Sequence, residues 1–77
     1  MYLSNKTIIK IKTYDETYAI NTILPEIGNV LSISSVSVDI GYNAKYEAIE
    51  EVYFQIVGTE STLLIRSHDV IHIYYKD

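Results

Sequence analysis

Apolar and polar residues alternate along most of this chain, and this period of two is the feature that most restricts its fold. Successive side chains of a β-strand point to opposite faces, so alternation buries one face and leaves the other in water. In residues 7–13 two isoleucines share one face, while Lys10 and Lys12 share the other. Residues 17–23 alternate in the same way after a polar turn. The sequence therefore predicts an N-terminal β-hairpin over residues 7–23.

The next run, residues 30–40, alternates with a break in its phase. Its first apolar residues occupy odd positions and its later ones even positions. The odd set comprises Leu31 and Ile33, and the even set comprises Val36, Val38 and Ile40. This break predicts a β-bulge or a sharp bend near Ser34 and Ser35. A bend of that kind lets one long strand serve two faces of a small barrel.

Residues 41–52 leave the alternating pattern. Within them, residues 44–52 are the one stretch rich in helix formers, and Tyr46 and Ile49 recur at helical spacing. The sequence leaves two alternatives for this excursion, which are a short helix near 44–52 and an ordered loop.

The last third of the chain predicts three more strands in residues 53–75. These strands cover residues 53–57, 62–66 and 70–75, with a turn at 58–61 and a single 3₁₀ turn at 67–69. We expect a mostly β, single domain over residues 1–77, folded as a small barrel or a strongly bent antiparallel sheet. The order of its elements is that of SH3-like barrels, which is an analogy of order alone. An α+β sheet carrying one short helix is the alternative.

Size and composition limit how such a domain is stabilised. The chain has 77 residues and no cysteine, so its core is small and disulfides are excluded. Its two histidines cannot form a closed metal site alone. The fold therefore depends on a well-packed core, on a partner such as a second copy of the chain, or on both.

Charge and hydropathy argue against two classes of partner. The net charge of −4 disfavours nucleic acid, because phosphate binding depends on Lys and Arg. No segment approaches the roughly 20 apolar residues that cross a membrane, and the N-terminus does not have the pattern of a signal peptide. We expect a soluble, cytoplasmic protein. Its wealth of Ile, Lys, Asn and Tyr is typical of an AT-rich genome, such as that of a low-GC bacterium, its phage or a mobile element.

The residues that could carry out catalysis are poorly placed for it. Ser67, His68 and Asp69 have the side chains of a hydrolytic triad, but consecutive residues cannot stack within hydrogen-bond reach in that order. His68 and His72 would share one face of a helix, whereas on a strand they lie about 13 Å apart. The three glycines are isolated and make no phosphate loop. We therefore expect no catalytic residue, no metal and no cofactor.

Acidic and aromatic side chains gather in the excursion that the strand pattern leaves out. Tyr42 and Tyr46 are rigid rings that bury a large area at little cost in entropy, which favours a place in an interface. Glu47, Glu50 and Glu51 would steer a partner with a basic surface. The sequence thus predicts a small, non-enzymatic protein-binding module, such as an inhibitor or an accessory factor.

Two other classes of function stay open. Lys10 and Lys12 could form a small nucleic-acid patch beside Tyr14 or Tyr18. Lysines on a strand also protect a sheet edge from intermolecular pairing, and this is the interpretation that we prefer. The third class is a structural protein that self-associates through the edges of its sheets.

Overall fold

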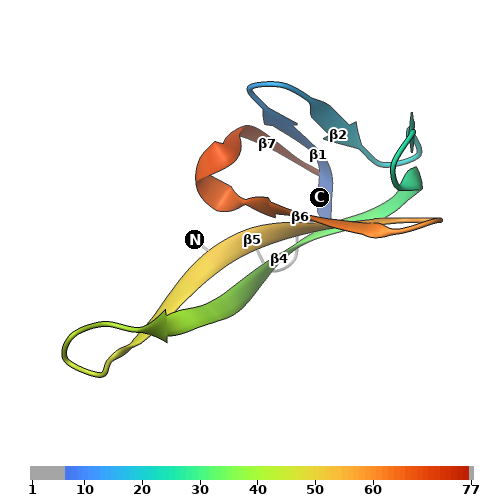
Figure 1. Ribbon diagram of the computed structural model, residues 1–77. Coiled ribbons are helices and arrows are strands. Elements are labelled where there is room, and N and C mark those ends of the chain that lie inside the picture. The colour runs from blue at the N-terminus through green and yellow to red at the C-terminus, as the bar shows by residue number, and fades with distance from the viewer. Residues whose placement is uncertain (1–6, 77) are drawn as a thin grey trace.

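The computed structural model describes residues 7–76 (Figure 1). The strands are β1 (Thr7–Thr13), β2 (Thr17–Ala19), β3 (Ile23–Leu24), β4 (Gly28–Tyr42), β5 (Ala48–Gly58), β6 (Thr62–Arg66) and β7 (Val70–Lys76), with a 3₁₀ turn, η1 (Ser67–Asp69), before β7. The mostly β fold class is confirmed. The described residues contain no α-helix, so the α+β alternative is wrong for this part of the chain.

The strands form two antiparallel sheets, with the orders β2-β1-β7 and β3-β4-β5-β6. β1 and β2 form the expected hairpin, but β3 belongs to the other sheet. η1 carries the chain out of the second sheet, so that β7 returns to pair with β1 (Figure 1). The sheets do not close into a barrel among the described residues. The fold there is a pair of open sheets, and nothing in it supports the SH3-like barrel.

A small apolar core lies between the two sheets. Its buried side chains come from β1, β4, β5 and the turn before β4. They are Ile8, Ile11, Ile27, Val30, Ile33, Phe54 and Ile56. Each such side chain contributes about 1.5–3 kcal/mol when fully buried. Gly58 allows the close approach of two segments here, because a Cβ at this position would collide with the carbonyl oxygen of Ile27.

β4 is longer than the strand that the sequence predicts, and its register is regular where a break was expected. Its pairing with β5 runs without a shift from Ser32 to Asp39, and register shifts lie on either side of that stretch. Of the two alternatives predicted near Ser34 and Ser35, the bulge is therefore wrong, and β4 passes through the place of the predicted bend as one unbroken strand.

The break in phase instead marks a change in the face that carries the apolar side chains. Ile33 lies across from Ile56 on the inner face, toward the core. Val36 lies across from Tyr53 on the outer face, which is turned away from the other sheet. Because side chains alternate along a strand, Ile33 faces the core while Val36 and Val38 face outward. Leu31 lies at the register shift between Val30 and Ser32 and is 54% exposed, and Val30 is buried in its place.

The short helix near 44–52, one of the two alternatives for this excursion, is also wrong. Residues 43–47 form a turn, and β5 begins at Ala48. A helix of two turns is marginal in water, because its first turn must be nucleated at high cost. Pairing with β4 gives the same backbone groups partners along the strand, so long-range pairing overrides the local propensity.

The distal parts of β4 and β5 form a two-stranded arm that projects from the body of the molecule (Figure 1). β6 pairs with β5 only from Tyr53 to Val57, and β3 pairs only with the start of β4. We call residues 37–52 the hairpin arm and residues 42–47 its tip. The Cα radius of gyration is 13.9 Å, above the roughly 11.5 Å of a compact chain of this length. The projecting arm contributes to this excess.

Candidate functional site

One asparagine holds the tip of the hairpin arm in shape. The side-chain oxygen of Asn43 accepts hydrogen bonds from the backbone N–H groups of Lys45, at 2.8 Å, and Glu47, at 3.1 Å. Its side-chain amide donates to a carboxylate oxygen of Glu47 at 3.2 Å. The backbone N–H of Tyr46 donates to the carbonyl of Asn43 at 3.0 Å and closes the turn. These bonds are local, so the tip is ordered before any partner arrives.

Tyr46 has a strained backbone conformation at this tip. Its φ of 61° lies in the left-handed region, which costs a residue with a side chain about 1–2 kcal/mol. The ring is 87% exposed, so packing within the chain does not offset that cost. Tyr42, at the end of β4, is 72% exposed. Backbone strain of this kind is common at binding sites, so it makes Tyr46 a candidate interface residue.

Two carboxylates face each other across the arm. The register places Asp39 of β4 directly opposite Glu50 of β5, so their side chains lie on one face. Like charges at opposed positions destabilise a strand pair. Neither side chain forms an ion pair within residues 7–76. The arm therefore carries negative charge that a cationic partner would neutralise.

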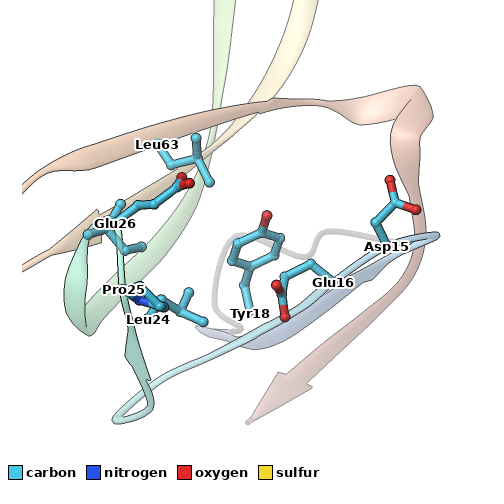
Figure 2. A pocket seen from close by; sticks show the side chains of 8 residues that line it. Asp15, Glu16, Tyr18, Leu24, Pro25, Glu26 and Leu63 are labelled. Carbon is cyan, nitrogen blue, oxygen red and sulfur yellow. The ribbon is translucent and has the colours of Figure 1, made fainter.

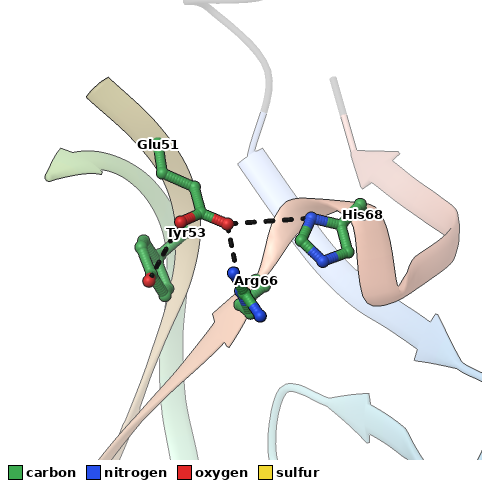
Figure 3. Close-up of polar contacts among 4 residues, drawn as sticks. All are labelled: Glu51, Tyr53, Arg66 and His68. Carbon is green, nitrogen blue, oxygen red and sulfur yellow. Dashed lines mark hydrogen bonds and ion pairs between the residues drawn. The ribbon is translucent and has the colours of Figure 1, made fainter. Parts of the chain in front are cut away.

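Glu51 points to the other face and is engaged at the base of the arm (Figure 3). The Nε of Arg66 donates to a Glu51 carboxylate oxygen at 3.0 Å. The hydroxyl of Tyr53 donates to the second oxygen at 3.4 Å, and His68 Nδ1 lies 3.7 Å from the first. The hydrogen bond from Arg66 is the main cause that lowers the pKa of Glu51, and that same bond raises the pKa of Arg66.

The predicted interface residues therefore divide into two groups. Tyr42, Tyr46, Glu47 and Glu50 lie together on the exposed arm. Glu51 is held by contacts within the chain, so its charge is partly neutralised before a partner binds. The sequence could not reveal this division, because Arg66 reaches Glu51 only through the pairing of β5 with β6.

A basic face lies on the other sheet. β1 is its central strand, with β2 and β7 on either side, so the interpretation of Lys10 and Lys12 as protection for an edge strand is wrong. The register places Lys10 opposite Tyr74 and Lys12 opposite His72. The Lys10 ammonium lies 4.4 Å from the centre of the Tyr74 ring, a cation–π contact. Aromatic side chains from β7 thus accompany these lysines in place of Tyr14 and Tyr18.

Sequence reasoning missed a pocket of about 340 Å³ beside the core (Figure 2). It is lined by Asp15, Glu16, Tyr18, Leu24, Pro25, Glu26, Ile27 and Leu63. Burial is the main cause that raises the pKa of the Tyr18 hydroxyl, followed by the charges of Glu16, Glu26 and Asp15. These residues come from separate segments, and no local motif joins them. The pocket adds a second region of negative charge to the surface.

The residues considered for catalysis and metal binding lie apart from one another. His68 in η1 faces Glu51 across 3.7 Å. His72 lies in β7 beside Tyr74, with ring centres 6.4 Å apart. Within the described part of the chain, no three His, Asp or Glu side chains are grouped to hold a metal ion. A search of the same residues finds no helix with the length and apolar character needed to span a lipid bilayer.

Comparisons with known proteins do not extend these observations. No protein family, curated protein or solved structure matches this chain.

Proposed function

We propose that this chain is a small, non-enzymatic protein-binding module that docks through the tip of its hairpin arm. The observation that carries the proposal is the exposed and strained Tyr46 on a pre-ordered turn, with Tyr42 close by. A bacterial, phage or mobile-element inhibitor or accessory factor that works in the cytoplasm fits a module of this kind.

The tip offers a partner affinity at low entropic cost. Tyrosines near the centre of an interface each contribute about 2 kcal/mol or more, which corresponds to roughly 30-fold in affinity. Because Asn43 already fixes the turn, little further ordering is needed when the rings are covered.

The charges on the arm select the kind of partner. Asp39 and Glu50 are opposed and unpaired within the described residues, and Glu47 lies at the turn beside them. A partner with Lys or Arg at its surface relieves this repulsion on binding and associates faster at low salt.

The test is a capture experiment with the immobilised chain and a lysate of the organism that encodes it. Replacement of both Tyr42 and Tyr46 by Ser is expected to abolish capture of the proteins retained by the wild type. The matched control is Tyr14→Ser, which removes a ring that is 78% exposed in a turn of the body. Equal capture by the wild type and the double variant, with both chains folded by circular dichroism, would refute the proposal.

A second candidate function is binding of single-stranded nucleic acid by the basic face. Lys10, Lys12, His72 and Tyr74 share this face, and Lys76 extends it along β7. The positions of β1, β2 and β7 that lie on it carry no carboxylate. A local patch of positive charge can attract nucleic acid even when the net charge of the chain is negative.

Fluorescence anisotropy with a labelled oligothymidine tests this candidate. Three lysine–phosphate contacts predict that log K falls with log salt concentration with a slope of about −2. Replacing Lys10 and Lys12 by Gln is expected to remove most of that slope, whereas Lys45→Gln at the arm tip leaves it unchanged. If no binding is detected at low salt, the candidate is excluded.

A further inference from the structure

We infer that two copies of this chain pair through the open edge of β4, in antiparallel orientation about a two-fold axis at Ser37. This inference concerns the side of the arm and holds whatever the tip binds. It starts from the hydrogen-bonding groups along β4. β5 pairs with one edge of this strand along its length, whereas on the other edge β3 and the segment before it reach only as far as Val30. From Ser32 to Tyr42 that second edge has no partner in the described chain.

This edge has little of the protection that exposed strands normally carry. Natural proteins guard open edges with charged side chains, proline or bulges. Between Ser32 and Tyr42 the edge contains no proline and one charged residue, Asp39. Its pairing with β5 is regular from Ser32 to Asp39, and one register shift, between Asp39 and Gly41, lies near the distal end of the edge.

The open edges of β5, β6 and β7 are more strongly charged. β7 carries His72 and Lys76, β6 ends in Arg66, and the distal half of β5 carries Glu50 and Glu51. Charge therefore protects each of these edges, and β4 is the long edge best suited to pair with another strand.

When two copies of β4 pair in antiparallel orientation, compatible side chains lie opposite one another. Ser37 is the midpoint of the open edge from Ser32 to Tyr42, so a two-fold axis there uses the whole edge and avoids β3 of the second copy. Val36 then lies across from Val38 of the second copy on the outer face. Asp39 lies across from Ser35 of the second copy on the inner face, so no carboxylate opposes another across the new pair. Two-fold contacts of this type are the commonest in oligomers of identical chains.

Pairing also addresses the instability of the arm itself. A two-stranded ribbon is at best marginally stable in water, whereas three or more strands with an apolar face are stable. The proposed contact joins two such ribbons into a four-stranded sheet in the order β5-β4-β4-β5. The two arms then point in opposite directions, and the tip of each arm begins beside Ser32 of the second copy.

The first test is the mass of the chain in solution, measured by sedimentation equilibrium at about 100 μM, where a complex with a Kd of ~1 μM is almost fully formed. The wild type is expected at twice the 8.8 kDa of one chain. Val36→Lys places a charge on the open edge and is expected to halve that mass. The control Tyr14→Lys changes an exposed residue of the body and is expected to leave the dimer intact. A monomeric wild type overturns the inference, as does a dimeric Val36→Lys variant.

A disulfide trap tests the register even if Val36→Lys fails to fold. The chain has no cysteine, so a single substitution supplies its only thiol. At the two-fold axis, Ser37→Cys places two thiols on opposed residues about 4.5–5.5 Å apart at Cα, within the range that a disulfide spans. The control Ser35→Cys keeps its two thiols about 13 Å apart. Rapid oxidation to a dimer is expected with Ser37→Cys alone, and cross-linking of Ser35→Cys instead would overturn the proposed axis.

Discussion

The body and the hairpin arm of this protein are built from the same two strands, yet different physics governs each. In the body, β4 and β5 bury Ile33 and Ile56 against the other sheet, so one face is fixed by the removal of apolar surface from water. In the arm, the same strands have solvent on both faces, and they carry opposed carboxylates and a tyrosine with positive φ. The features that reduce stability are thus concentrated in the arm, which contributes little to the buried core. This separation is typical of a scaffold that presents a binding element.

The largest expected difference between the two regions comes from two isoleucines of β5. Ile56 is fully buried in the body, whereas Ile49 is 37% exposed in the arm. Ile56→Ala is expected to lower the free energy of unfolding by about 2–5 kcal/mol through lost burial and a cavity. Ile49→Ala is expected to lower it by less than about 1 kcal/mol. Urea denaturation followed by circular dichroism gives both values.

Because a chain of this size is only marginally stable, a loss at the upper end of this range would leave little folded Ile56→Ala variant to measure. Ile56→Val then serves in its place, with an expected loss of about 0.5–1.5 kcal/mol. Equal losses at positions 49 and 56 would contradict the division into body and arm.

A smaller effect, of opposite sign, is expected at the tip. Tyr46→Gly removes the left-handed strain and is expected to stabilise the turn by about 1 kcal/mol, even though it shortens an aromatic side chain to hydrogen. The matched control is Ala44→Gly in the same turn, where φ is not positive and where glycine is expected to cost about 0.5–1 kcal/mol. Hydrogen exchange of the backbone amides of Asn43 and Glu47, whose bonds close the turn, reports the local opening.

The same substitution sharpens the proposal for function. If Tyr46 is retained for binding, the glycine variant is more stable and captures less partner than the wild type. A variant that gains no stability would show that the turn tolerates tyrosine without strain. A variant that is more stable and captures as much partner as the wild type would show that Tyr46 is not an interface residue.

The mostly β class was predictable because alternation is a local property that survives in the folded chain. Which residues of each strand face the core was harder to predict. Ile9 and Ile11 share a face in a regular strand, but the structure buries Ile8 and Ile11 and leaves Ile9 at the surface. A register shift between Ile8 and Lys10 changes the phase of β1. Such a bulge inserts one residue for reasons that lie in the partner strand, which the sequence of β1 does not reveal.

Sequence reasoning identified the aromatic and acidic residues of the arm but assigned them a helix or a loop. Tyr42 and Tyr46 stood out because they lie outside the alternating runs, and the structure places both on the exposed arm. The helix-like composition of 44–52 was misleading, because pairing with β4 outweighs a local preference of a few tenths of a kcal/mol per residue. Contacts such as that of Glu51 with Arg66 depend on the register between strands, so composition gives no sign of them.

The smallest expected effect concerns the ion pair at the base of the arm. Arg66 lowers the pKa of Glu51 in the folded chain, so the ionised carboxylate is stabilised relative to the unfolded chain. The resulting stability is present above the pKa of Glu51 in the unfolded chain, near 4.3, and is lost as pH falls through the lower folded value. Because the pair lies at the surface, the change is small and is screened by salt.

This pH dependence can be assigned to the pair by a double-mutant cycle. Urea midpoints at neutral pH and below about pH 3 are compared for the wild type, Glu51→Gln, Arg66→Gln and the double variant. Glu51→Gln is expected to remove the whole share of the acid-dependent loss that depends on this carboxylate, and Arg66→Gln most of it, because Tyr53 and His68 also lower the pKa of Glu51. Adding Arg66→Gln to Glu51→Gln is expected to change nothing further. Additive effects would mean that Arg66 and Glu51 act independently. In that case the base of the arm would be held to β6 by strand pairing alone, and the arm would be free to move about Tyr53 without breaking a charged contact.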